Sequence, residues 1–178
     1  MVVAVSADIV KPKPHGAGIE LPAIIGKLPA HGDFIARGVL HSERERLDSW
    51  MTSWIDHARS ELGDGFDDAY LSAPPWLFES ERLTAVLIPS VDAVGRRFPA
   101  LALADRHLRT QSVYDSLVVA LEEGQGSDEL RATVSSLECG NAGKPMTAGE
   151  WFLPDGAQSQ LPSPANVDGW ADVKEFLA

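Results

Sequence analysis

The spacing of apolar residues predicts one long amphipathic helix in the first third of the chain. Residues 42–63, SERERLDSWMTSWIDHARSELG, place apolar side chains every three or four positions, so that they share one helical face. Ser42 and Glu45 have the spacing of a capping box, and Gly63 offers a left-handed end to the helix. A stripe with two tryptophans is typical of a core-facing helix; it consists of Leu47, Trp50, Met51, Trp54, Ile55, Ala58 and Leu62.

Shorter apolar runs predict strands. AIIGKL (residues 23–28), RLTAVLIPS (82–90) and FPALALA (98–104) are the best candidates, and the last two are continuous enough for strands covered on both faces. FDDAYLSAPPWLF (66–78) is interpreted as a turn that leads into an edge strand, because Pro74 and Pro75 cannot donate ladder hydrogen bonds. EWFLP (150–154) predicts a late strand.

Further helices are expected at residues 111–123, 128–137 and 172–178, and GNAGKPMTAG (140–149) is expected to be a loop. Strands and helices therefore alternate, which favours a single α/β domain: a three-layer α/β/α sandwich around a mixed sheet. Residues 1–20 include a Pro- and Gly-rich stretch without periodicity. We interpret them as an N-terminal extension, partly disordered, ahead of a domain that spans residues 21–178.

Composition narrows the classes of partner. The formal net charge of −11 argues against nucleic acid, whereas a basic protein surface would be attracted. No stretch has the ~20 consecutive apolar residues that a membrane span needs, so membrane insertion is not expected. The N-terminus lacks the basic region of a signal peptide, and Cys139 is the only cysteine. These features favour a cytoplasmic protein without internal disulfides.

The polar turn between the two central strand candidates, IPSVDAVGRRFP, carries the most suggestive chemistry. Ser90 is not in a G-x-S-x-G nucleophile elbow, and Lys27 lacks the preceding glycine of a P-loop. The histidines show no metal-binding spacing, so neither a metal nor a cofactor is expected. A small-anion or phosphopeptide-binding module, or a hydrolase, using Arg96, Ser90 and Asp92, stays open as the alternative to a non-enzymatic protein.

Three long blocks resemble the signature blocks of the TagF family of type VI secretion-associated proteins, also called the ImpM family. They are GKLPAHGDFIARGVL (residues 26–40), DAYLSAPPWLF (68–78) and VLIPSVDAVGRRFPALA (86–102). With GEWFLPDG (149–156), the similarity covers about residues 23–178. Two departures are visible: Arg97 stands where an aromatic residue is common, and Trp151-Phe152 where a Trp-Trp pair is usual.

The resemblance implies an α/β/α fold without enzymatic activity of its own. It also implies a cytoplasmic, post-translational repressor of type VI secretion that binds the system's forkhead-associated scaffold protein. Such proteins act beside the threonine-phosphorylation pathway of a kinase and a phosphatase. A structural assembly subunit, which would stay bound in the secretion machine, is a further alternative.

We expect the turns GKLPAHGDF and PSVDAVGRRFP to meet at one edge of the sheet. Asp33 or Asp92 would pair with Arg96, and Phe34 and Phe98 would pack beneath. This cluster is either a docking surface or a structural support of the fold. The exposed charges of the long helix (Glu43, Glu45, Asp48, Asp56, Glu61) are the other candidate surface. The candidate interaction cluster consists of Gly26, Lys27, Pro29, Gly32, Asp33, Phe34, Trp76, Pro89, Ser90, Asp92, Gly95, Arg96, Phe98 and Pro99.

Overall fold

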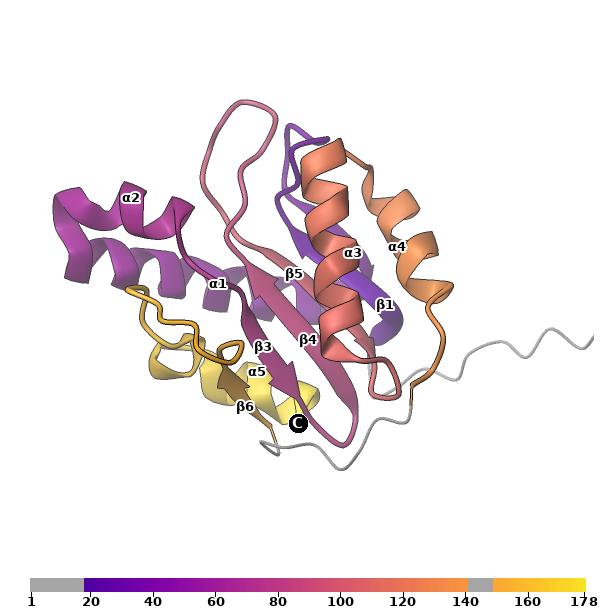
Figure 1. Ribbon diagram of the computed structural model, residues 1–178. Helices are drawn as coiled ribbons and strands as arrows, with labels where there is room; N and C mark the ends of the chain where they lie inside the picture. Colours follow the sequence, from indigo (N-terminus) through magenta and orange to yellow (C-terminus); the bar gives the residue numbers. More distant parts are fainter. Residues whose placement is uncertain (1–17, 141–148) are drawn as a thin grey trace, which may run out of the picture.

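A single antiparallel sheet organises the protein. The computed structural model describes residues 18–140 and 149–178, and its six-stranded sheet has the order β2-β1-β5-β4-β3-β6 (Figure 1). The strands are β1 (Ile19–Gly26), β2 (Ile35–Val39), β3 (Trp76–Glu79), β4 (Leu83–Ile88), β5 (Ala100–Asp105) and β6 (Glu150–Phe152). All five neighbouring pairs among these strands are antiparallel.

The predicted α/β single-domain fold is confirmed, but the predicted mixed sheet is wrong. Short reversing turns join β1 to β2, β3 to β4 and β4 to β5, and such turns produce antiparallel pairs. The helices connect strands that are not neighbours in the sheet, β2 to β3 and β5 to β6. They therefore form no crossover of the kind that parallel neighbours require.

Helices cover both faces of the sheet (Figure 1). Residues of α1 (His41–Leu62), α2 (Phe66–Leu71) and α5 (Trp170–Leu177) share one core cluster with the sheet. Residues of α3 (Thr110–Glu123) and α4 (Ser127–Ser135) share the other. Two short 3-10 helices, Gly63–Gly65 and Pro164–Asn166, complete the regular elements of the described chain. None of its helices is long and apolar enough to cross a membrane.

The central strand β5 shows how the sequence divides the core. Its alternation ALALAD sends Leu101 and Leu103 into the cluster of α1, α2 and α5. The alanines at 100, 102 and 104 enter the cluster of α3 and α4. β5 therefore presents leucines to one helical layer and alanines to the other.

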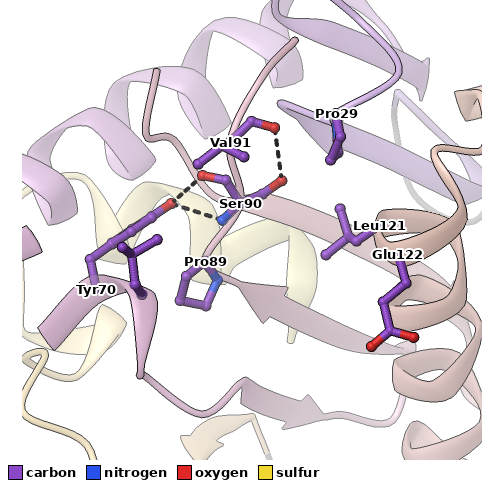
Figure 2. Close-up of a pocket in the computed structure, with 8 residues that line it drawn as sticks. Pro29, Tyr70, Pro89, Ser90, Val91, Leu121 and Glu122 are labelled. Atoms are coloured by element: carbon purple, nitrogen blue, oxygen red, sulfur yellow. Dashed lines mark hydrogen bonds between the residues drawn. The ribbon is translucent and has the colours of Figure 1, made fainter. Parts of the chain in front are cut away.

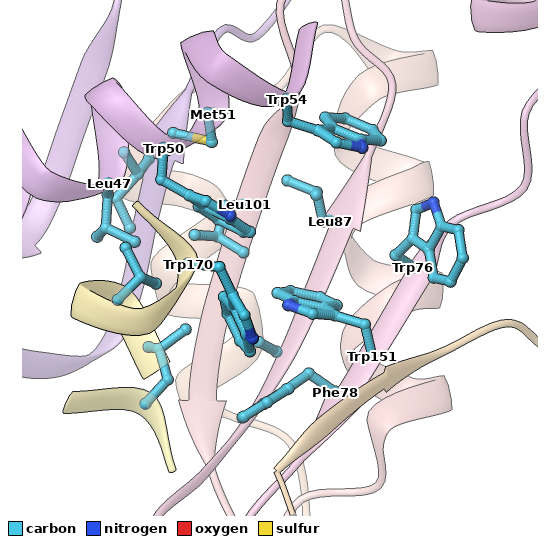
Figure 3. Packing of buried hydrophobic residues seen from close by; sticks show 14 of the residues in the cluster. Leu47, Trp50, Met51, Trp54, Trp76, Phe78, Leu87, Leu101, Trp151 and Trp170 are labelled. Atoms are coloured by element: carbon cyan, nitrogen blue, oxygen red, sulfur yellow. The ribbon is translucent and has the colours of Figure 1, made fainter. Parts of the chain in front are cut away.

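Tryptophans join α1 to the C-terminal part of the chain (Figure 3). The ring of Trp50 lies 5.7 Å from the rings of both Trp151 and Trp170, measured between centroids. Its indole N–H donates to the carbonyl of Pro164 at 2.9 Å. The indole N–H of Trp54 donates to the carbonyl of Pro162 at 2.8 Å. The apolar stripe predicted for the long helix is therefore core, and its indole N–H groups are satisfied.

Three elements differ from the sequence-based predictions. Residues 66–71 form a helix, α2, and β3 lies between β4 and β6, so it is not an edge strand. β2 was not predicted; its pairing with β1 shifts register, and Gly38 lies there at φ +76°. A Cβ atom at Gly38 would collide with the carbonyl oxygen of Glu20, so glycine is required at this close approach.

The ends of the predicted elements also shift. α1 begins at His41, and Ser42 donates to the carboxylate of Glu43 and makes no capping hydrogen bond, so the capping box is wrong. Residues 19 and 20 of the predicted extension belong to β1. Residues 1–17 of that extension, and residues 141–148 of the predicted loop, lie outside the described residues.

Candidate functional site

The two predicted strand-end turns lie side by side. We call residues 27–34, between β1 and β2, and residues 89–99, between β4 and β5, the turn cluster. Lys27 N–H donates to the carbonyl of Pro99 at 3.2 Å, and Ala93 N–H donates to that of His31 at 3.0 Å. At the base, Gly26 has φ +114°, and a Cβ there would collide with the carbonyl oxygen of Pro99. Glycine therefore allows β1 to approach the second turn.

The second turn is a closed hairpin built from main-chain hydrogen bonds. Phe98 N–H donates to the carbonyl of Ser90 at 3.1 Å, and Asp92 N–H donates to that of Arg96 at 3.1 Å. Gly95 N–H donates back to the carbonyl of Asp92 at 2.9 Å. Gly95 has φ +84°, the left-handed conformation that a tight reversal favours. The turn is thus a folded unit with a fixed shape.

The carboxylate of Asp92 holds the turn cluster together. One oxygen accepts from the N–H groups of Val94 (3.1 Å) and Arg96 (2.9 Å). The other accepts from Arg96 Nε (2.6 Å) and lies 3.0 Å from Lys27 Nζ. Burial alone would raise the pKa of Asp92, but these hydrogen bonds hold the pKa well below its usual value. Asp92 is therefore an ionised internal anchor whose side chain is fully covered.

The predicted Asp92–Arg96 pair is present, and Asp33 is only a distant second partner of Arg96. Its Oδ1 lies 3.9 Å from Arg96 Nη2 and its side chain is fully exposed. Arg96 Nη2 also donates to the carbonyl of Gly32, which joins the second turn to the first. Arg97 pairs with neither aspartate; its Nη2 lies 3.1 Å from Oδ2 of Asp67 in α2.

The predicted aromatic pair packs beneath these charges. The rings of Phe34 and Phe98 meet edge to face, with centroids 5.7 Å apart and planes at 74°. The guanidinium of Arg44, on α1, lies over the Phe34 ring at 5.5 Å. One phenylalanine comes from each turn, so the pair adds an apolar contact to the polar contacts above.

Tyr70 ties α2 to the second turn (Figure 2). Its hydroxyl donates to the carbonyl of Ser90 and accepts from the N–H of Ser90, both at 3.0 Å. Burial raises the pKa of Tyr70 well above its usual value, against the opposing effect of the hydrogen bond to Ser90. Tyr70 therefore stays protonated and satisfies both main-chain groups of a buried residue.

The geometry gives the hydrolase alternative no support at Ser90. The Ser90 hydroxyl makes one long contact, 3.5 Å to the carbonyl of Val91, and no described histidine hydrogen-bonds to it. Asp92 is fully used by Lys27 and Arg96, so it is not free to orient a base. Within residues 18–140 and 149–178, no three His, Cys, Asp or Glu side chains are grouped to hold a metal ion.

Most of the predicted cluster is brought together, but Trp76 is not part of it. Trp76 pairs with Leu87 in the sheet and is buried in the core cluster under α1. Pro29, Pro89 and Ser90 line a cavity beside the turns. Sequence reasoning missed the Lys27–Asp92 contact and the role of Tyr70, because both join segments that no local motif connects.

The other candidate surface, on α1, contains mostly local pairs. Glu45 lies 3.3 Å from His41, Glu61 lies 3.5 Å from His57, and both pairs have i,i+4 spacing. Burial raises the pKa of Asp48, while the nearby Arg44 charge opposes that rise. Pairs of this kind are typical of a solvated helix face.

Comparison with known proteins gives a family and a related structure. Residues 23–135 match the family model of the TagF N-terminal domain, described as type VI secretion system-associated. No curated protein matches the chain. The crystal structure of PA0076 from Pseudomonas aeruginosa PAO1 is similar, with 25% sequence identity and a TM-score of 0.51. The similarity covers 86% of this chain and 77% of that one.

Proposed function

We propose that this chain, which belongs to the TagF N-terminal domain family of type VI secretion system-associated proteins, is a non-enzymatic regulator of that system. In this proposal it acts in the cytoplasm as a post-translational repressor, by binding the forkhead-associated scaffold protein. In this proposal the protein acts alongside the threonine-phosphorylation pathway of a kinase and a phosphatase. The secretion association follows from the family, and the repression and the partner are the proposal.

The observation that carries the proposal is that the central charged groups of the turn cluster are already paired with each other inside the protein. Asp92 binds Lys27 and Arg96, and Tyr70 satisfies the main chain of Ser90. A site for chemistry needs groups that are free to bind or transfer protons. A preorganised surface whose central charged groups are paired suits protein recognition instead, because little order is lost on binding.

The tip of the second turn provides a place to test this binding. Val94 is 71% exposed, an unusual position for a large apolar side chain, and only its main chain supports Asp92. We expect the purified protein to form a stable complex with the forkhead-associated protein of its own secretion cluster in size-exclusion chromatography with light scattering. Val94→Ser should weaken that complex about tenfold, because an apolar contact is lost.

Leu40→Ser is the matched control. Leu40 is 64% exposed and follows the end of β2 that lies away from the turn cluster. Val94→Ser should melt like the wild-type protein, since an exposed side chain contributes little to stability, and Leu40→Ser should melt no lower, because Leu40 is the N-cap residue of α1, where serine is favoured. The proposal fails if the wild-type proteins do not associate and overproduction of this chain leaves type VI secretion unchanged. If Val94→Ser and Leu40→Ser weakened the complex equally, the interface would not be at the tip of the second turn.

A further inference from the structure

We propose that the cavity between the turn cluster, α2 and the end of α3 is a docking site for a protein segment that presents an apolar side chain next to a basic one. The inference rests on the proposed function for the existence of a protein partner, and it adds the chemistry of the docking segment. It is carried by the shape of the cavity, the rigidity of its walls and a carboxylate at its edge that pairs with no described residue.

The cavity is apolar and suits a side chain better than a cofactor (Figure 2). Its volume is about 250 Å³. Sites for small organic ligands usually enclose roughly 300–1,000 Å³. The lining comes from both turns, α2 and α3, and consists of Pro29, Tyr70, Leu71, Pro89, Ser90, Val91, Leu121 and Glu122.

The walls of the cavity are fixed before any partner arrives. Tyr70 and Ser90 are buried and hydrogen-bonded to each other, and Pro29 and Pro89 have restricted main chains. Leu71, at the end of α2, is 64% exposed, so a large apolar side chain borders the opening. A rigid apolar pocket with an exposed apolar edge is the usual receptor for an anchoring side chain.

The negative charge of Glu122 at the cavity favours a docking segment with a basic residue next to its apolar anchoring residue. Glu122 is the only charged residue among the lining, and its carboxylate has no hydrogen bond or ion pair with any described residue. Glu122 and Glu123 lie in the last turn of α3, which contains no basic residue. The helix dipole disfavours acidic groups at this end, so fold stability does not explain them. With a net charge of −11, the protein repels acidic or phosphorylated segments.

The test is an NMR titration of the full-length ¹⁵N-labelled protein with three peptides. Each is a Gly/Ser octapeptide with one central pair: Leu-Arg, Ala-Arg or Leu-Glu. We expect the Leu-Arg peptide to bind with a dissociation constant on the order of 1 mM and to shift the amide signals of Leu71, Val91 and Glu122. The Ala-Arg and Leu-Glu peptides should bind at least tenfold more weakly.

Paired variants separate binding from folding. Glu122→Lys should abolish the shifts, while Glu123→Lys, the same charge change beside the cavity, should retain most of them. Leu71→Ser should weaken binding about tenfold, and Leu40→Ser, at an equally exposed position elsewhere, should not. None of the four variants should melt lower than the wild-type protein. Exposed side chains contribute little to stability, a cation suits this end of α3, and serine is favoured at Leu40, the N-cap residue of α1.

Several outcomes would overturn the inference. The first is that no amide signals shift up to 5 mM peptide, about five times the expected dissociation constant, or that the shifts map to residues away from the cavity. The second is that the Leu-Glu peptide binds more strongly than the Leu-Arg peptide. The third is that Glu122→Lys and Glu123→Lys change binding equally. Peptide binding at the cavity without a complex between the chain and the forkhead-associated protein would retain the docking site and reject the proposed partner. The reverse result would retain the partner and reject the docking site.

Discussion

At the scale of single residues, Asp92 determines whether the turn cluster keeps its shape. Its two oxygens accept hydrogen bonds from main-chain N–H groups of its own turn and contact cations from both turns. A carboxylate in such surroundings is stabilised in its charged form. The residue therefore links the local shape of the hairpin to the contact between the two turns.

Asp92→Asn should lower the melting temperature at pH 7 by about 5 °C or more, because the amide presents an N–H₂ group to Lys27 and Arg96. The pKa of Asp92 is depressed in the folded protein, so its contribution to stability is present above the unfolded pKa of about 4. That contribution is lost as pH falls below this value. The gap between wild type and variant should then narrow from pH 4 to pH 3 in melts recorded from pH 7 to pH 3.

Asp33→Asn provides the control for this experiment. Asp33 is fully exposed and lies 3.9 Å from the same arginine, so solvent screens the interaction. Its replacement should leave the melting temperature within about 1 °C at every pH. A pH-independent gap for Asp92→Asn would contradict the assignment of Asp92 as an ionised anchor.

Single-residue predictions from sequence succeeded where partners are local. Asp92 and Arg96 are four residues apart in one turn, so their pairing could be proposed from the chain itself. Lys27 could not be assigned to Asp92, because that contact depends on β1 lying beside β5 and β5 beside β4. Glu122 carries no sequence signal, since its position beside Pro29 and Pro89 is set by the packing of α3 on the sheet.

At the scale of elements, Tyr70 connects α2 to the turn after β4. Tyr70→Phe removes the acceptor of the buried N–H of Ser90, while the carbonyl of Ser90 keeps its hydrogen bond from the N–H of Phe98. An unsatisfied buried polar group costs about 1–3 kcal/mol, so we expect the free energy of unfolding to fall by about 2 kcal/mol in urea denaturation. The signals of Ser90 and Val91 should also shift in NMR spectra.

Tyr114→Phe is a suitable comparison for this variant. Tyr114 lies on α3, is partly exposed, and its hydroxyl makes no hydrogen bond with a described residue. Loss of that hydroxyl should change the free energy of unfolding by less than about 0.5 kcal/mol. If both variants were equally stable, Tyr70 would not support the turn as the structure indicates.

Elements with strong periodicity were predictable, and elements shaped by pairing were not. β4, β5, α1 and α3 have apolar patterns that require burial, and they were predicted nearly at their observed bounds. β2 has the sequence IARGV, with a glycine and an arginine that weaken any strand signal, and it forms because β1 offers a paired edge. β3 was assigned to an edge because of Pro74 and Pro75, but both prolines lie before the strand, which begins at Trp76 and pairs with β6.

At the scale of the whole molecule, the C-terminal segment completes a core that begins at residue 19. The family match ends at residue 135, yet Trp151, Trp170, Val173 and Leu177 are buried in the cluster that contains Trp50 and Phe78. β6 also covers the edge of β3. The matched region and the segment after it therefore share one core.

A chain that ends at residue 140 should consequently fail to fold cooperatively. It would expose Trp50 and Phe78, leave the edge of β3 unpaired, and lose the acceptors of the Trp50 and Trp54 indoles. Each large aromatic lost from a core costs about 3–5 kcal/mol, and two such losses approach the entire stability of an average domain. We expect no cooperative thermal transition and a weak near-ultraviolet circular dichroism signal, whereas a chain that lacks only residues 1–17 should melt cooperatively. A sharp transition for the shorter chain would instead show that the region matched by the family model folds without the C-terminal tryptophans.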